Sequence, residues 1–277
     1  MTTERAEIAV SSTRPTAVGW RWRLAPETVI TVGTILVILL LWYAVSVSGI
    51  VPPYFVPTPM QTWQTFLRIL EEGYRGHTIW EHLLASLSRV LLAFGASAVI
   101  GVPLGLAMGS DRRIAAVFDL PIEFYRPLPP LAYYTLLIIW LGIDNASKVA
   151  LLFLAALPPV VIATATGVRA VRSDYLHGAQ ALGAGRWQLF RYVIFPACLP
   201  DIFTGLRVSI GFTYTTLVAA EMVAGVDGVG WMVLDASKFL QSDVIFVGII
   251  LMGITGALLD AGVRWLDRLI VPWRGKG

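Results

Sequence analysis

Long stretches without any charged residue alternate with short polar segments along this chain. The uncharged windows cover residues 28–67, 90–110, 127–143, 149–168, 208–220 and 244–259. A bilayer core about 30 Å thick is crossed by roughly 20 apolar residues of helix. Extended over their uncharged or snorkelling flanks, the windows predict six membrane-spanning helices near 28–48, 88–109, 125–142, 148–168, 202–223 and 244–263.

The composition agrees with this pattern and narrows the class of protein. Hydrophobic residues make up 56% of the 277 residues and charged residues 14%, whereas soluble proteins average roughly 45–50% and about 25%. There are too few charged residues to cover the surface of a soluble protein of this size. A net charge of +3 is too small to indicate binding of nucleic acid. Cys198 is the single cysteine, which excludes a disulfide framework. We predict an all-α, polytopic membrane protein.

The distribution of positive charge predicts the orientation. Lysine and arginine favour the cytoplasmic side of a membrane. Fourteen of them lie before the first span, in the second and fourth loops and in the tail, and five lie in the other loops. We therefore expect a cytoplasmic arm at 1–27, one transmembrane domain at 28–267 and a cytoplasmic tail at 268–277, with both termini in the cytoplasm.

Two proline clusters interrupt the predicted spans. Pro127, Pro129 and Pro130 stand at the entry of the third span, and Pro158 and Pro159 lie in the middle of the fourth. Proline lacks an N–H and breaks or kinks a helix. Broken backbone at membrane depth is tolerated only where it is buried in protein or lines a water-filled cavity. The clusters indicate helices around a pathway, with ordinary proline kinks as the alternative.

A few polar residues stand in or beside the spans, where they are costly and often functional. The candidates for lining a pathway are Arg126, Tyr214, Thr215, Thr216 and Glu221. Two alternatives stay open. Arg126 shares a helical face with Glu123, so the two can form a structural ion pair, and the polar run at 213–216 can face neighbouring helices instead.

The predicted second span has a face of small residues. Gly101, Gly105 and Gly109 recur at every fourth position. Such a face lets the backbone of another helix approach closely, which is how helices gain contact within lipid. We expect these glycines to serve helix packing.

The chain lacks the residues that catalysis needs. A phosphate-binding loop ends in Gly-Lys-Ser/Thr, and none of the three lysines stands in that pattern. The three histidines lie outside the predicted spans, which disfavours an intramembrane serine protease and a histidine-rich metal site. We expect no catalytic residue, metal or cofactor on this chain. A proton-coupled secondary transporter is the alternative from a different class, although the uncharged windows hold no protonatable group of the kind it needs.

The long cytoplasmic loop, about residues 169–200, carries the most specific pattern. It consists of a short helix of small and apolar residues, a glycine break and a second amphipathic stretch stopped by proline. The residues that form its low-relief surface are Ala179, Leu182, Gly183 and Ala184. A simple connection between two spans needs neither this length nor this apolar character, so we expect the loop to dock onto a partner protein.

This loop resembles the cytoplasmic coupling motif of the permease subunits of binding-protein-dependent ABC importers. The motif runs Glu-Ala-Ala, three residues, Gly, nine residues, Ile, one residue, Leu-Pro. The residues on that register are Ala179, Gly183, Val193 and Pro196, while His177 stands in place of the glutamate. Further resemblance to the nitrate/sulfonate/taurine branch, and within it to taurine permeases, lies in segments 123–132, 140–143, 147–148, 204–207, 217–221 and 272–273.

The resemblance implies the type I ABC importer permease fold, similar to the methionine importer, in a bacterial inner membrane. Two permease copies would pair with two cytoplasmic ATPases, which hold ATP and Mg, and with a periplasmic or lipid-anchored substrate-binding protein. The chain would translocate taurine by alternating access, with aliphatic sulfonates or nitrate as alternative substrates. The residues implied in ATPase coupling are Ala179, Leu182, Gly183, Ala184, Val193 and Pro196.

Overall fold

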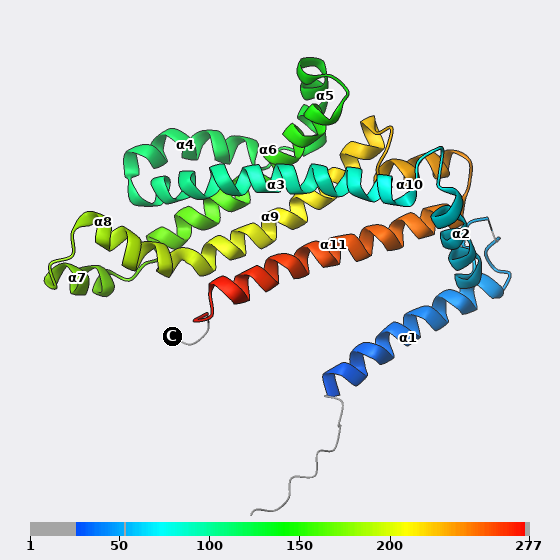
Figure 1. Cartoon of the computed structure of the whole chain (residues 1–277), viewed down its shortest axis with the longest axis horizontal. Coiled ribbons are helices and arrows are strands. Elements are labelled where there is room, and N and C mark those ends of the chain that lie inside the picture. The colour runs from blue at the N-terminus through cyan, green and yellow to red at the C-terminus, as the bar shows by residue number, and fades with distance from the viewer. Residues whose placement is uncertain (1–25, 53, 275–277) are drawn as a thin grey trace, which may run out of the picture.

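The computed structural model of the chain describes residues 26–52 and 54–274, so nearly all of the predicted arm at 1–27 lies outside the described residues. Within them the regular elements are helices (Figure 1), as the sequence predicts. The elements are α1 (Pro26–Val47), α2 (Pro59–Glu72), α3 (Ile79–Ser110), α4 (Arg112–Tyr125), α5 (Pro130–Leu141), α6 (Asn145–Arg169), α7 (Ser173–Ala181), α8 (Arg186–Leu189), the π-helical turn η1 (Phe190–Ile194), α9 (Phe195–Ala224), α10 (Val229–Lys238) and α11 (Ser242–Ile270).

Five helices among the described residues are long and apolar enough to cross a membrane: α1, α3, α6, α9 with the segment before it, and α11. They correspond to the predicted spans near 28–48, 88–109, 148–168, 202–223 and 244–263. Two of them start well before the predicted position. α3 begins with a capping box formed by Thr78 and Glu81, so a more polar turn precedes its apolar part. α9 begins at Phe195, and Pro196 stands in its first turn, where proline is tolerated.

The predicted third span, 125–142, is not one continuous helix. α4 packs beside α3 and the second half of α6, and α5 packs beside the first half of α6. α5 has 12 residues, which span about 18 Å at 1.5 Å per residue and are too few to cross alone. The break at Arg126–Pro129 separates the two helices, because each proline lacks a donor and disfavours helical backbone in the residue before it.

α6 lies between α3 and α9 and packs against both. The face of Gly101, Gly105 and Gly109 on α3 meets α6, which confirms its predicted packing role. A Cβ added at Gly105 would lie 2.6 Å from the Cβ of Thr164, and one at Gly109 would lie 2.5 Å from the Cβ of Val168. The absence of side chains at these positions therefore sets the distance between the two helices.

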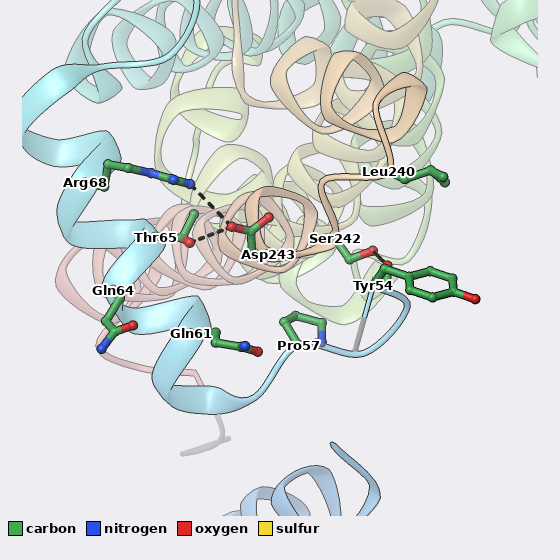
Figure 2. A pocket seen from close by; sticks show the side chains of 9 residues that line it. All are labelled: Tyr54, Pro57, Gln61, Gln64, Thr65, Arg68, Leu240, Ser242 and Asp243. Carbon is green, nitrogen blue, oxygen red and sulfur yellow. Dashed lines mark hydrogen bonds and ion pairs between the residues drawn. The ribbon is translucent and has the colours of Figure 1, made fainter. Parts of the chain in front are cut away.

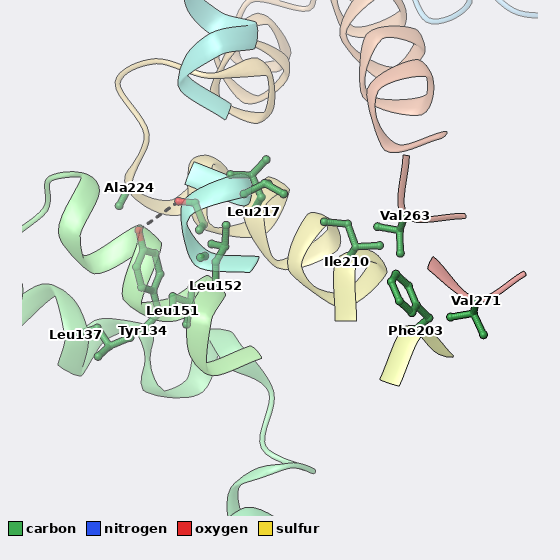
Figure 3. Packing of buried hydrophobic residues seen from close by; sticks show 13 residues of the cluster. Tyr134, Leu137, Leu151, Leu152, Phe203, Ile210, Leu217, Ala224, Val263 and Val271 are labelled. Carbon is green, nitrogen blue, oxygen red and sulfur yellow. Dashed lines mark hydrogen bonds between the residues drawn. The ribbon is translucent and has the colours of Figure 1, made fainter. Parts of the chain in front are cut away.

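A large apolar cluster joins α5, α6, α9 and α11 (Figure 3). Its members include Tyr134, Leu137, Leu151, Leu152, Phe203, Ile210, Leu217 and Val263. The Tyr134 side chain is buried, and its hydroxyl donates to the carbonyl oxygen of Ala220 at 3.5 Å, so the short α5 is tied to α9. Between helices in a membrane this packing acts through dispersion contacts, since lipid is as apolar as the side chains.

α1 stands apart from the other helices over most of its length (Figure 1). It meets them near its end, where the rings of Trp42 and Phe246 stack with centroids 5.4 Å apart. Nε1 of Trp42 also donates to the carbonyl oxygen of Pro57 at 3.0 Å. Other apolar side chains of α1, such as Leu36 and Ile38, are exposed, which leaves this face available to lipid or to another subunit.

Short helices lie at the two ends of the bundle (Figure 1). α7 and α8 lie at the end where α3 and α6 finish and α9 begins, and the last turn of α11 lies at the same end. α2 and α10 lie at the opposite end. These are the α7 end and the α2 end of the bundle.

Candidate functional site

A cavity of about 470 Å³ opens beside the break between α4 and α5. Both predicted proline clusters meet in its wall, Pro127, Pro129 and Pro130 from the break and Pro158 and Pro159 from α6. The residues of α9 in the wall are Thr204, Gly205, Val208 and Phe212. The interrupted backbone thus lines a cavity, which is the condition under which it is tolerated at membrane depth.

Tyr125 and Arg126 bring polar groups to this cavity. Arg126 is exposed and has no carboxylate within ion-pair distance among the described residues, so the possible pair with Glu123 does not form there. The hydroxyl oxygen of Tyr125 is buried and lacks a hydrogen-bond partner in the described part of the chain. The exposed guanidinium of Arg126 can donate charge-assisted hydrogen bonds to an anionic oxygen.

The other predicted pathway residues do not line this cavity. The hydroxyl of Tyr214 donates to a backbone carbonyl of α11 at 2.8 Å. Thr216 and Glu221 are buried, whereas Thr215 is exposed with its hydroxyl bonded to the backbone of its own helix. The structure therefore brings Arg126 to the cavity without the polar run of α9.

A second polar centre lies inside the protein towards the α2 end. The side chain of Glu221 is 0% exposed and that of Arg89 is 3% exposed. Nη1 of Arg89 donates to Oε1 of Glu221 at 2.8 Å, and the same guanidinium contacts the carboxylate of Asp227. It also donates to Asn145 at 2.7 Å, and the hydroxyl of Ser86 donates to Glu221 at 2.8 Å. Buried charges persist when they are paired and hydrogen-bonded, as here.

This buried charge cluster holds the turn between α9 and α10. The backbone N–H of Gly230 donates to Oε2 of Glu221 at 2.9 Å, and that of Gly228 donates to Nδ1 of His82 at 3.1 Å. Gly228 has a φ of 102°, and a Cβ there would lie 2.4 Å from the carboxylate of Glu221. Glycine is required at this position both by the backbone conformation and by the close approach.

The sequence pattern does not reveal this cluster. It predicts Glu221 as a residue that lines the pathway, and it counts Arg89 only among the positive residues outside the cytoplasmic segments. The available signal is that both residues border uncharged windows, where an ionisable side chain is expensive unless it is paired. The partners are 132 residues apart along the chain, so no local spacing predicts their contact.

A pocket of about 330 Å³ lies between α2 and the start of α11 (Figure 2). Figure 2 shows Thr65 and Arg68 of α2 pointing toward Asp243, to which they donate at 2.7 Å and 3.4 Å. Nearby, the hydroxyl of Tyr74 donates to Asp235 of α10 at 3.1 Å. Burial, and after it Asp235, raises the pKa of the Tyr74 hydroxyl. These contacts tie α2, α10 and α11 together at this end.

The predicted coupling segment lies at the α7 end. α7 finishes in a left-handed turn, with a φ of 85° at Gly183. The N–H of Gly183 donates to the carbonyl of Gln180 at 2.9 Å and that of Ala184 to Ala179 at 3.0 Å, which is a Schellman cap. The turn presents Leu182 outward, and this side chain is 91% exposed. This side chain is therefore available for a contact with another protein.

The second half of the segment runs through α8 and η1 into α9. Val193 and Pro196 are half-buried where the segment joins α9. Trp187 and Tyr192 are 71% and 72% exposed. Aromatic side chains are enriched at protein interfaces. This half of the segment therefore offers exposed apolar side chains, as Leu182 does in the first half.

The sequence is similar to those of several known proteins. A model of the family described as binding-protein-dependent transport system inner membrane component matches residues 101–274. The chain is 42% identical to the taurine transport system permease protein TauC of Escherichia coli, over 93% of this chain and 94% of that protein. It is 35% identical to the putative aliphatic sulfonates transport permease protein SsuC of Bacillus subtilis, over 87% of this chain and 86% of that protein. It is 34% identical to the nitrate import permease protein NrtB of Synechocystis sp., over 80% and 82%.

The fold has a counterpart among solved structures. An inward-facing structure of the MetNI methionine ABC transporter matches with a TM-score of 0.61 and 15% identity, over 69% of this chain and 97% of that chain. This likeness confirms the predicted methionine-importer-like fold. With its apolar spans, its interrupted helix around a cavity and these relatives, the chain is a transport subunit and not an enzyme. It belongs to the family of inner membrane components of binding-protein-dependent transport systems, the permease subunits of ABC importers.

Proposed function

We propose that this permease imports taurine across the bacterial cytoplasmic membrane. The observation that carries the proposal is the 42% identity to a taurine permease over 93% of the chain. Aliphatic sulfonates and nitrate, named for relatives at 35% and 34% identity, are the alternative substrates. All three substrates carry an anionic oxygen, which Arg126 in the proline-lined cavity can contact through charge-assisted hydrogen bonds.

In the proposed assembly two copies of the chain enclose the pathway. Two cytoplasmic ATPases hold ATP and Mg, and a periplasmic or lipid-anchored binding protein delivers the substrate. The excess of arginine at the α7 end supports placing that end and both termini in the cytoplasm. Closure of the ATPases on ATP moves the segment at about 169–200 and turns the cavity outward, and release of the hydrolysis products resets it.

The substrate is tested with the reconstituted complex. We expect taurine with its binding protein to stimulate ATP hydrolysis more than alkanesulfonates or nitrate do with theirs. Stimulation by nitrate or alkanesulfonates alone would overturn the assignment of taurine. Uptake that survives depletion of ATP and collapses with the proton gradient would instead support a secondary transporter.

The coupling role is tested at Leu182. Leu182→Asp should abolish substrate-stimulated ATP hydrolysis and leave membrane insertion intact, because this side chain is 91% exposed and supports nothing within the chain. A change at Gly183 is less informative, since its φ of 85° strains any other residue. Ile50→Asp is the matched control, with a side chain 83% exposed at the end of α1 near α2. Normal stimulation in Leu182→Asp would show that this turn does not couple.

A further inference from the structure

A wide, charged pocket lies between α9 and α11 near the α7 end. Its volume is about 740 Å³. The charged residues in its wall are Arg207, Asp260, Arg264, Asp267, Arg268 and Arg274. Four guanidiniums thus face two carboxylates, which leaves an excess of two positive charges in one cavity at the edge of the transmembrane bundle.

The internal ion pairs do not use all of this charge. Asp260 pairs with both Arg207 at 2.9 Å and Arg264 at 2.8 Å. Asp267 contacts Arg274. Arg268 has no ion-pair partner among the described residues and is exposed. Arg264 and Arg207 remain 42% and 53% exposed, so their remaining N–H donors are open to a ligand.

The surface beside this pocket is apolar and aromatic. Trp265 and Leu269 on α11 are 63% and 64% exposed, and Trp273 just after the helix is 45% exposed. Tryptophan is enriched at the level of the lipid headgroups. A soluble anion needs only the charges, whereas a molecule with an anionic head and apolar tails uses both surfaces.

We propose that this pocket binds the phosphodiester headgroup of an acidic phospholipid of the phosphatidylglycerol or cardiolipin class. Arg264 and Arg268 donate to the phosphate oxygens, as guanidinium does in other phosphate sites. The acyl chains lie along Trp265 and Leu269. Basic pockets between helices at the cytoplasmic face are a known form of lipid recognition. The site is independent of the transported substrate, and it needs only that the α7 end of the bundle lies at a membrane surface.

The test measures lipid retained by the purified full-length permease complex in phosphatidylcholine nanodiscs, titrated with cardiolipin and read by native mass spectrometry. The double variant Arg264→Gln with Arg268→Gln should weaken cardiolipin binding about 30-fold, because each arginine contributes about 1 kcal/mol to binding at a membrane surface. Arg268→Gln alone, which breaks no ion pair, should weaken it about 5-fold and guards against misfolding of the double variant. Arg112→Gln with Arg113→Gln, two exposed arginines at the same end, should change binding little.

The outcomes separate the possible ligands. Unchanged retention in both pocket variants, or an equal loss in the Arg112 and Arg113 control, overturns the proposal. Millimolar inorganic phosphate that displaces cardiolipin completely would mark the pocket as a site for free anions and also overturns it. Because lipid retention is read without transport, a wrong substrate assignment leaves this result unaffected.

Discussion

Replacing Arg89 by methionine should destabilise the chain far more than the loss of any exposed ion pair. Methionine retains much of the apolar stem and removes the guanidinium. Glu221 would then keep only the neutral donors of Ser86 and Gly230 as direct partners, and the buried Lys148 would act on it only through space. Asp227 would lose its contact with the arginine as well.

The magnitude follows from the burial of both charges. The side chains of Arg89 and Glu221 are 3% and 0% exposed, and removing one partner of such a pair costs about 3–5 kcal/mol. For a chain of this length each kcal/mol lost from the free energy of unfolding lowers the unfolding temperature by about 2–4 °C. We therefore expect a decrease of roughly 6–20 °C in Arg89→Met.

The assay is thermal unfolding in detergent or nanodiscs, followed by tryptophan fluorescence. Arg68→Met is the control, because its ion pair with Asp243 has side chains 55% and 32% exposed and is worth about 1 kcal/mol or less. Arg89→Met combined with Glu221→Leu should recover part of the loss, since no uncompensated buried acid then remains in the pair. An unfolding temperature of Arg89→Met equal to that of the Arg68 control would refute the reasoning.

Three other substitutions probe helix packing and the cavity. Gly105→Val should lower the free energy of unfolding by about 1–3 kcal/mol, because its Cβ would lie 2.6 Å from the Cβ of Thr164. Gly95→Ala should lower it little, because a Cβ at that position meets open space. Equal unfolding temperatures of the two variants would contradict the described packing of α3 on α6. Arg126→Ala should lower taurine uptake without changing stability, with Arg126→Lys retaining part of it, and wild-type uptake in both would remove Arg126 from the pathway. Tyr214→Phe loses its bond to α11 and should cost about 1 kcal/mol with normal substrate-stimulated ATP hydrolysis; a loss of stimulation in a stable variant would return Tyr214 to the pathway.

The long spans were predictable because each is a local property. A run of about 20 uncharged residues can satisfy its backbone inside lipid only as a helix, so α1, α3, α6, α9 and α11 follow from where charge is absent. The glycine face of α3 was also predictable from local sequence, since glycines at every fourth position lie on one side of a helix. The end of α7 was predictable from the glycine at 183, because glycine adopts the left-handed backbone conformation that the C-terminal cap of a helix needs.

The structure of the predicted third span could not be derived from local sequence patterns alone. The uncharged window at 127–143 is long enough for a span only with its flanks, and the prolines at its start separate α4 from α5. The sequence indicated a break, but not that the more polar segment 112–125 would fold back beside α3. That choice depends on Ala115 and Ile122 packing against α6, a contact between distant segments.

The sequence by itself determined the class of the protein, its main spans, the break near Arg126 and the glycine turn after α7. Each of these depends on composition or on spacing within one helix. The tertiary structure alone decided that both proline clusters share one cavity, that Glu221 is paired with Arg89 rather than open to that cavity, and that four arginines gather between α9 and α11. These are contacts across many residues of chain, and their energy comes from burial and charge pairing that exist only after the helices pack.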